Sequence, residues 1–201
     1  VVEASYPGVT LAAGNILANF TAGAFVQVAD SFGAIGSATG SVQVENRPMS
    51  VKQLAQISTN KTKDALDSAN GDAAKQILEA TSQGLGSTND DGGRRSLLAS
   101  GNGDKKAVRA SILASLWDTF AITPTTQTDM SSLLNVLASN INTPGEVTTE
   151  VASSSLSFLS TVLNVSLEAN IGVSATGAGL VGDILTSLFA TSLFNASSAS
   201  S

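Results

Sequence analysis

Two hydrophobic rhythms divide the chain near Pro48. Before it, apolar residues alternate with polar or small ones, as in the FVQV run at residues 25–28, and this alternation is typical of strands. It predicts three β-strands, at residues 9–14, 24–30 and 40–46. Asp30, Gly33 and Gly36 supply turn chemistry between the last two, because aspartate binds nearby backbone amides and glycine accepts positive φ. Three such strands cannot form an independent sandwich, so they require further strands or a helical cover.

From Ser50 onward, apolar residues recur at every third or fourth position, which is the spacing of one helix face. The stripes are Val51, Leu54, Ala65 and Leu66; Ala74, Leu78, Thr81 and Leu85; Val108, Ile112, Leu116 and Phe120; Met130, Leu134, Leu137 and Ile141; Ala152, Leu156, Leu159 and Leu163; and Val181, Ile184 and Leu188. Each stripe is one face wide, so the helices must pack against one another. The pattern predicts about six helices in a bundle-like domain.

Two short motifs predict helix starts. Asn70 precedes Gly71 and Asp72 and is placed as an N-cap. The run Thr143-Pro144-Gly145-Glu146 has the spacing of a capping box with proline at the first helical position. Glu146 and Glu150 lie one helical turn apart near this start, where carboxylates complement the helix dipole.

The fold class predicted from these patterns is α+β: a short N-terminal antiparallel β segment followed by a mainly α-helical bundle. The expected divisions are residues 1–47 as terminal strands, 48–86 as a helical hairpin, 87–104 as a flexible glycine-rich connector, 105–195 as a second helical subdomain and 196–201 as a disordered tail.

Charge is scarce and uneven. Charged residues make up 13 % of the 201 residues, and serine and threonine supply much of the remaining polarity. All ten basic side chains lie between Arg47 and Arg109, so the net charge of −6 belongs to the C-terminal part. This distribution argues against nucleic-acid binding and against docking on anionic lipid. A hydroxyl-rich surface is common in glycosylated extracellular proteins and in low-complexity linkers, and we favour the extracellular interpretation.

The residues that usually carry catalysis are missing. The chain has no cysteine and no histidine, which excludes disulfides, typical structural zinc sites and Ser-His-Asp or Cys-His catalysis. Asp90 and Asp91 are adjacent but lack the converging oxygens of a calcium loop. Trp117 and Phe120, at helical spacing, are expected in the core. We therefore expect no enzymatic activity, cofactor or metal in this segment. No apolar run is long enough for a membrane span.

Four sequons of the Asn-x-Ser/Thr type occur, and each asparagine is a candidate acceptor of an N-linked glycan. The acceptors are Asn19, Asn60, Asn164 and Asn195. Asn60 and Asn195 are the strongest candidates because their neighbours are polar. We read the chain as a segment of a longer protein.

The order of motifs resembles a known family. Its first part is the strand–turn–strand run VQVADSFGAIGSATGSVQV, which contains the turn Asp30-Ser31-Phe32-Gly33. A helical segment with a Gly71-Asp72 break follows. Together these two parts resemble the C-terminal end of the receptor-for-egg-jelly (REJ) region of polycystin-like proteins. The run from VRASILASLWDTF to the TPGEVTTE helix start is similar to the helical subdomain of the GAIN region that follows in that family. The resemblance covers residues 22 to about 165. The serine- and alanine-rich composition is also similar to that of green-algal secreted proteins.

The resemblance implies that the strands end an Ig-like REJ β-sandwich, with Asp30, Phe32 and Gly33 as its structural turn. It implies a large extracellular region of a membrane receptor or channel-associated protein, often on cilia, concerned with adhesion or sensing. Expected partners are other extracellular domains of the same longer chain and other cell-surface or ciliary proteins. The family's self-cleavage at a His-Leu-Ser/Thr site cannot lie in these residues, because the chain has no histidine.

Two alternatives stay open. The segment could be a structural unit of a ciliary surface filament, similar to a mastigoneme, or its anchor, because a weakly charged hydroxyl-rich surface permits close packing. It could also belong to a hydrolase whose active site lies elsewhere in a longer protein.

Overall fold

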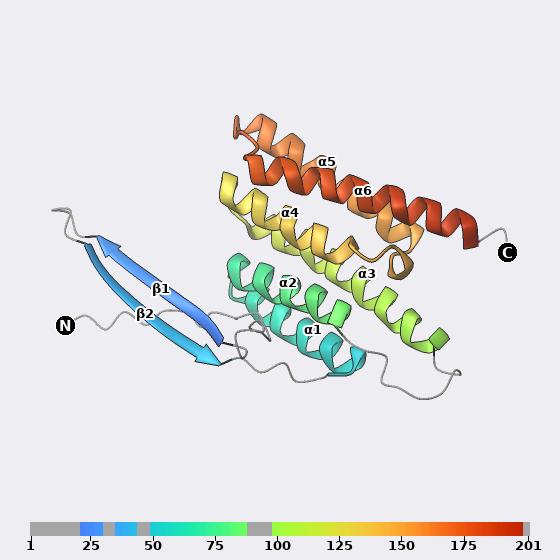
Figure 1. Cartoon of the computed structure of the whole chain (residues 1–201). Helices are drawn as coiled ribbons and strands as arrows, with labels where there is room; N and C mark the ends of the chain where they lie inside the picture. The colour runs from blue at the N-terminus through green and yellow to red at the C-terminus, as the bar shows by residue number, and fades with distance from the viewer. Residues whose placement is uncertain (1–20, 30–34, 44–48, 88–97, 199–201) are drawn as a thin grey trace. The chain divides into compact units, whose positions relative to one another are not determined.

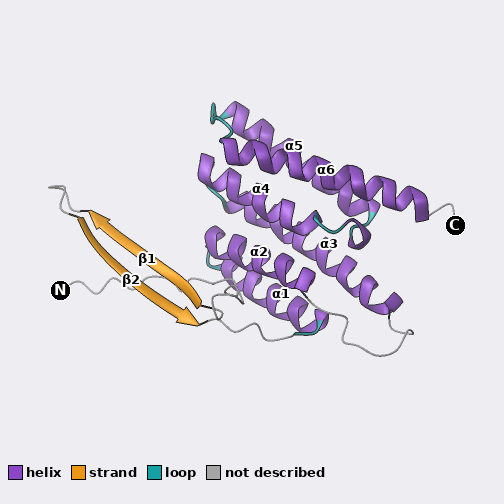
Figure 2. Ribbon diagram, in the orientation of Figure 1, coloured by secondary structure: helices purple, strands orange, loops and turns teal. Residues whose placement is uncertain are grey.

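The computed structural model describes residues 21–29, 35–43, 49–87 and 98–198, and the chain divides into two compact units, Val1–Pro48 and Met49–Ser201. The described part of the first unit is a two-stranded hairpin, and that of the second contains six α-helices (Figure 2). The chain is therefore mostly helical, with a short β segment at the N-terminal end of the described residues.

The hairpin pairs β1 (Thr21–Ala29) with β2 (Ile35–Gln43) in antiparallel register, with Phe25 opposite Thr39. β2 begins earlier than the alternation predicted, and Gly36 is not a turn residue: it lies in β2 opposite Val28. The first half of β2 consists mainly of small residues, whose backbone groups form the ladder although their side chains give no hydrophobic alternation. The predicted strand at 9–14 and the turn residues Asp30, Phe32 and Gly33 lie outside the described residues.

Six helices form three consecutive hairpins. They are α1 (Val51–Asp67), α2 (Gly71–Ser87), α3 (Leu98–Ile122), α4 (Gln127–Ile141), α5 (Thr149–Glu168) and α6 (Ala175–Ser198), with a short 3₁₀ turn, η2 (Pro144–Glu146), before α5. α3 packs against both α1 and α5, while α4 packs against both α2 and α6, so the α3–α4 hairpin lies between the other two (Figure 1). The helical unit is a stack of helix pairs around one shared core.

Local signals explain the first hairpin. Ser50 caps α1, accepting from the Gln53 backbone N–H, while the Gln53 side chain accepts from the Ser50 backbone N–H. α1 ends in a left-handed turn at Ala69, whose φ is 51°. The predicted cap at Asn70 is confirmed, because its side chain accepts from the Ala73 N–H at 3.0 Å. These contacts join α1 to α2 within three residues.

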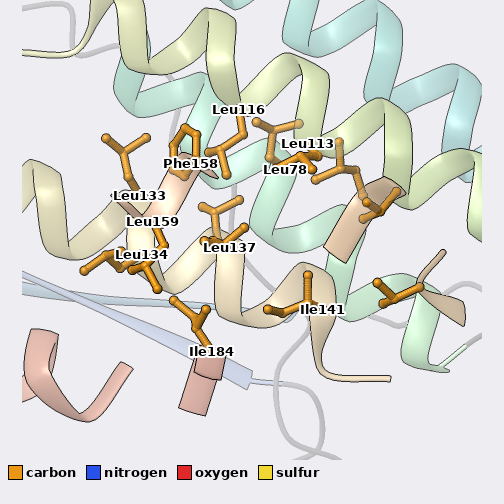
Figure 3. Packing of buried hydrophobic residues seen from close by; sticks show 14 of the residues in the cluster. Leu78, Leu113, Leu116, Leu133, Leu134, Leu137, Ile141, Phe158, Leu159 and Ile184 are labelled. Carbon is orange, nitrogen blue, oxygen red and sulfur yellow. The ribbon is translucent and has the colours of Figure 1, made fainter. Parts of the chain in front are cut away.

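One hydrophobic cluster fills the space between the hairpins. Leu78, Leu116, Leu137, Phe158 and Ile184 come from five helices and are all 1 % exposed or less (Figure 3). The stripes predicted for α2 and α4 are buried throughout, as expected from their spacing. Sequence patterning thus identified most of the core.

The predicted stripe on α5 is partly wrong. Leu156 is 51 % exposed, whereas Ser155 is fully buried in the same row as Val151, Phe158 and Val162. A serine at a core position interrupted the hydrophobic pattern. The apolar spacing therefore predicted a buried face of α5 that includes the exposed Leu156 and leaves out the buried Ser155.

Two predicted irregular segments are partly helical. α3 begins at Leu98, inside the expected connector of residues 87–104, and α6 extends to Ser198, inside the expected tail. Residues 88–97 and 199–201 lie outside the described residues. Gly101 and Gly103 cost a helix only about 1 kcal/mol each, and burial of the apolar residues Val108, Ile112 and Leu116 further along α3 offsets that cost.

Candidate functional site

The most concentrated polar chemistry of the described residues surrounds the N-terminal half of α3. Lys105 and Arg109 are one helical turn apart, so their side chains emerge on one face. Arg109 is fully buried, and its Nε donates to Glu146 Oε2 at 3.0 Å. Lys105 Nζ lies 3.2 Å from Glu146 Oε1. Two cations from α3 therefore share one carboxylate on η2.

Asn140, near the end of α4, completes this cluster. Its Nδ2 donates to the Arg109 backbone carbonyl at 3.0 Å, and a terminal nitrogen of Arg109 donates to the Asn140 backbone carbonyl. Asn140 is fully buried. The reciprocal bonds fix the α3–α4 crossing, while Glu146 holds the chain that leads into α5. We call Lys105, Arg109, Asn140 and Glu146 the Arg109 cluster.

The predicted capping box at Thr143 is wrong. Thr143 makes no capping hydrogen bond, and Pro144 begins the 3₁₀ turn η2 rather than an α-helix. The Glu146 carboxylate is instead held by Arg109, where a buried guanidinium binds it more strongly than a backbone N–H would. α5 begins at Thr149, and Thr148 is its N-cap, accepting from the Val151 N–H at 3.2 Å.

Glu150 does lie in the first turn of α5, as the dipole argument expected, but it does not form a pair with Glu146 for acid–base chemistry. Its carboxylate accepts hydrogen bonds from its own backbone N–H and from the Thr148 hydroxyl, and these lower its pKa. Glu150 is exposed, whereas Glu146 is committed to Arg109. The two carboxylates therefore have separate structural roles.

A second ion-pair group joins α2 to the start of α4. The Lys75 side chain is 7 % exposed, and its Nζ lies 2.6 Å from Asp129 Oδ1 and 2.7 Å from Asp72 Oδ1. Burial disfavours the charged lysine, but the hydrogen bonds to Asp129 and Asp72 outweigh this and raise the pKa of Lys75. Burial likewise acts against a charged Asp129, yet the bonds from Lys75 and Thr126 lower the pKa of that carboxyl.

Both groups connect helices rather than line a site. Arg109 is fully buried, and the Lys105 and Lys75 side chains are almost so. Each cation faces a carboxylate of another element. Across the ranges the structure describes, no three carboxylate, histidine or cysteine side chains gather in a way that could hold a metal ion. The arrangement is suited to holding helix positions.

An aromatic cluster supports the same junction between α3 and α5. Trp117 lies 4.8 Å from Phe158 and Phe120 lies 5.7 Å from it, ring centroid to ring centroid, all in edge-to-face geometry. Phe158 is fully buried, and the other two pack against the core. The expected core role of Trp117 and Phe120 is confirmed.

The candidate glycan acceptors lie in different environments. Asn60 on α1 and Asn164 on α5 are both exposed. Asn195 belongs to α6, and its side chain is outside the described residues, as is the whole of Asn19. The structure does not bring the acceptors together.

Sequence reasoning did not identify the two ion-pair groups. A signal for the Arg109 cluster was present, because Lys105 and Arg109 are basic residues at helical spacing beside the apolar stripe that contains Val108 and Ile112. Its partner Glu146 lies 37 residues away and Asp129 lies 54 residues from Lys75, so neither pair has a local signature.

Comparison with family models, curated protein sequences and solved structures finds no match to this chain. None of the helices in the described ranges combines the length and apolar character that crossing a bilayer requires.

Proposed function

We propose that this chain is a non-enzymatic extracellular scaffold segment of a polycystin-like receptor or channel-associated ciliary protein. In this proposal the hairpin is the end of a REJ-type β-sandwich and the helical unit is a GAIN-like subdomain. The segment acts as an adhesive or force-bearing spacer between other extracellular domains and is displayed on the ciliary membrane.

The observation that carries the proposal is the use of buried charge. Arg109 and Lys75 each bridge elements distant in sequence: Arg109 is paired with Glu146, and Lys75 is paired with Asp129 and Asp72. Separating the partners of a buried ion pair leaves an uncompensated buried charge, so each pair disfavours other arrangements of the helices. Such fixed positions are what a spacer needs, whereas a catalytic cation must remain accessible to substrate.

Two further features support it. The β-hairpin is marginal as an isolated element, so it is suited to continue a larger sheet. The motif order that resembles the REJ and GAIN regions runs across the junction between the two units.

Protease treatment of intact native cells tests the location. An antibody raised against the helical unit should lose its epitope when intact cells are treated with protease, while a cytosolic marker protein stays intact. Protection of the epitope until the cells are lysed would contradict an extracellular segment.

The filament alternative is favoured by the outer face of α6. Ala178, Gly182, Leu185 and Phe189 recur at 4-3-4 spacing and are all exposed, with Phe189 70 % exposed. If two copies of α6 met antiparallel, Leu185 would lie opposite Gly182 of the second copy and Phe189 opposite Ala178. Each large side chain would thus face a small one, which allows close helix approach and would supply one contact between subunits.

Sedimentation of the full chain tests this alternative. A Phe189→Ser variant should self-associate more weakly than the unmodified chain. Leu167→Ser is the matched control, because Leu167 is 78 % exposed and lies outside the α6 face. Monomeric behaviour of the unmodified chain at high concentration would remove the support that this face gives to a filament.

A further inference from the structure

Thr62 on α1 is a buried polar residue whose hydroxyl makes no hydrogen bond in the fold. It is 1 % exposed, and its hydroxyl, like that of Ser155 on α5, has no hydrogen-bond partner. Among the described residues, most buried hydroxyls donate to the carbonyl one turn earlier, as Thr81 does to Ile77 at 2.7 Å. A buried hydroxyl left without a partner destabilises a fold, so its presence requires an explanation.

For Thr62, unlike Ser155, the sequence supplies one, because Thr62 is the third residue of the sequon Asn60-Lys61-Thr62. The hydroxyl of a sequon is needed when the glycan is transferred, which in secreted proteins happens as the chain enters the secretory pathway. Once α1 forms, residues two apart point to opposite sides of the helix. Asn60 accordingly faces solvent while Thr62 faces the core.

We propose that Asn60 carries an N-linked glycan and that its first sugar covers Ile57. This inference rests on the proposed extracellular location. In the transfer, Asn60 Nδ2 forms a bond to the anomeric carbon of an oligosaccharide carried on a lipid diphosphate. The bond from that carbon to the diphosphate oxygen breaks, the diphosphate leaves with the bonding electrons, and the amide nitrogen loses one proton.

Ile57 gives the glycan a structural role. It is 48 % exposed and precedes Asn60 by three residues, so the two side chains are neighbours on the surface of α1. An acetamido sugar linked to Asn60 presents an apolar C–H face within reach of the isoleucine. Asn164 has the mirrored relation to Leu167, but its sequon serine, Ser166, bonds to the Val162 carbonyl and is explained by the fold.

Glycopeptide mass spectrometry tests occupancy on the full chain secreted from a eukaryotic host behind a cleavable leader. We expect a glycan on the peptide containing Asn60 in the unmodified chain and in Thr62→Ser, and none in Thr62→Val. An unmodified Asn60 in folded, secreted protein would overturn the proposal. Because the host is heterologous, that result is independent of where the native protein is found.

Hydroxyl-radical footprinting tests the covering of Ile57. An endoglycosidase that leaves the first sugar should leave Ile57 protected, whereas an amidase that removes the whole glycan should expose it. Because a ring on the neighbouring side chain screens part of the isoleucine surface, we expect oxidation of Ile57 to be slower with the first sugar in place than after its removal. Leu156, exposed and distant from Asn60 in sequence, is the internal control. Equal oxidation of Ile57 in both samples would overturn the covering role.

Discussion

Replacing Glu146 with glutamine would leave the Arg109 guanidinium buried and charged without its carboxylate. Arg109 is fully buried, and an arginine cannot lose its charge in a protein. The Glu146 side chain is 13 % exposed, so little water replaces the lost charge. Removing one partner of such a buried pair typically destabilises a protein by about 3–5 kcal/mol.

That loss is a large part of the stability of a domain, which is commonly about 5–15 kcal/mol. For a chain of this size it corresponds to a fall in Tm of about 6–20 °C. Arg109→Met should cost less than Glu146→Gln, because Glu146 keeps Lys105 at 3.2 Å and retains some exposure. The double variant should cost less than the sum of the two changes, since it removes the unpaired charge.

Urea unfolding followed by far-UV circular dichroism measures these differences. Lys63→Ala is the control, because the Lys63–Asp67 pair joins two well-exposed side chains on α1 and should contribute nothing measurable. If Glu146→Gln unfolds at the same urea concentration as Lys63→Ala, the Arg109 cluster does not hold the helices together as argued.

Three further predictions concern other contacts. The fold lowers the pKa of Asp129, so the charged carboxylate stabilises the folded protein above the ordinary aspartate pKa, near pH 4, and this stabilisation is lost as the pH falls through the folded pKa. In Asp129→Asn the free energy of unfolding should therefore depend less on pH in acid than in the unmodified chain. Urea unfolding across that pH range measures the difference. Unglycosylated Thr62→Val should be more stable than the parent by about 1 kcal/mol, seen as a higher Tm; a lower Tm would mean that the hydroxyl is satisfied. Phe158→Ala should cost about 3–5 kcal/mol in urea unfolding and also change near-UV circular dichroism, because Phe158 contacts Trp117.

Much of the helical unit could be predicted from the sequence because its core positions are mainly aliphatic. Val108, Ile112 and Leu116 recur every fourth residue on α3, and all three are buried. The Asn70 cap was equally local, since its side chain bonds to a backbone group three residues away. Signals within one helical turn are read directly from the chain.

Other features depend on partners far along the chain. The Thr143-Pro144-Gly145-Glu146 run matches a capping box, but Arg109 from α3 donates a hydrogen bond to the Glu146 carboxylate. The run forms a 3₁₀ turn instead of the start of an α-helix. There a tertiary contact overrode local propensity, which is a weak preference by comparison. Leu98 begins α3 in a segment whose glycines predict a loop, and helix propensity alone did not place this start.

The hydroxyl residues explain why apolar spacing understates this core. Five buried serines and threonines donate to the carbonyl four residues earlier: Thr81, Ser82, Thr119, Ser166 and Thr191. A hydroxyl satisfied within its own helix needs no partner on a neighbouring one, so these small side chains can occupy core positions beside leucine and phenylalanine. A chain with few charges can then use hydroxyls both inside and outside. Ser155 on α5 and Thr62 on α1 depart from this bonding pattern, because both are buried and neither hydroxyl has a hydrogen-bond partner. The buried Ser155 is the reason why the face of α5 could not be chosen from hydrophobicity alone, whereas the hydroxyl of Thr62 belongs to a sequon.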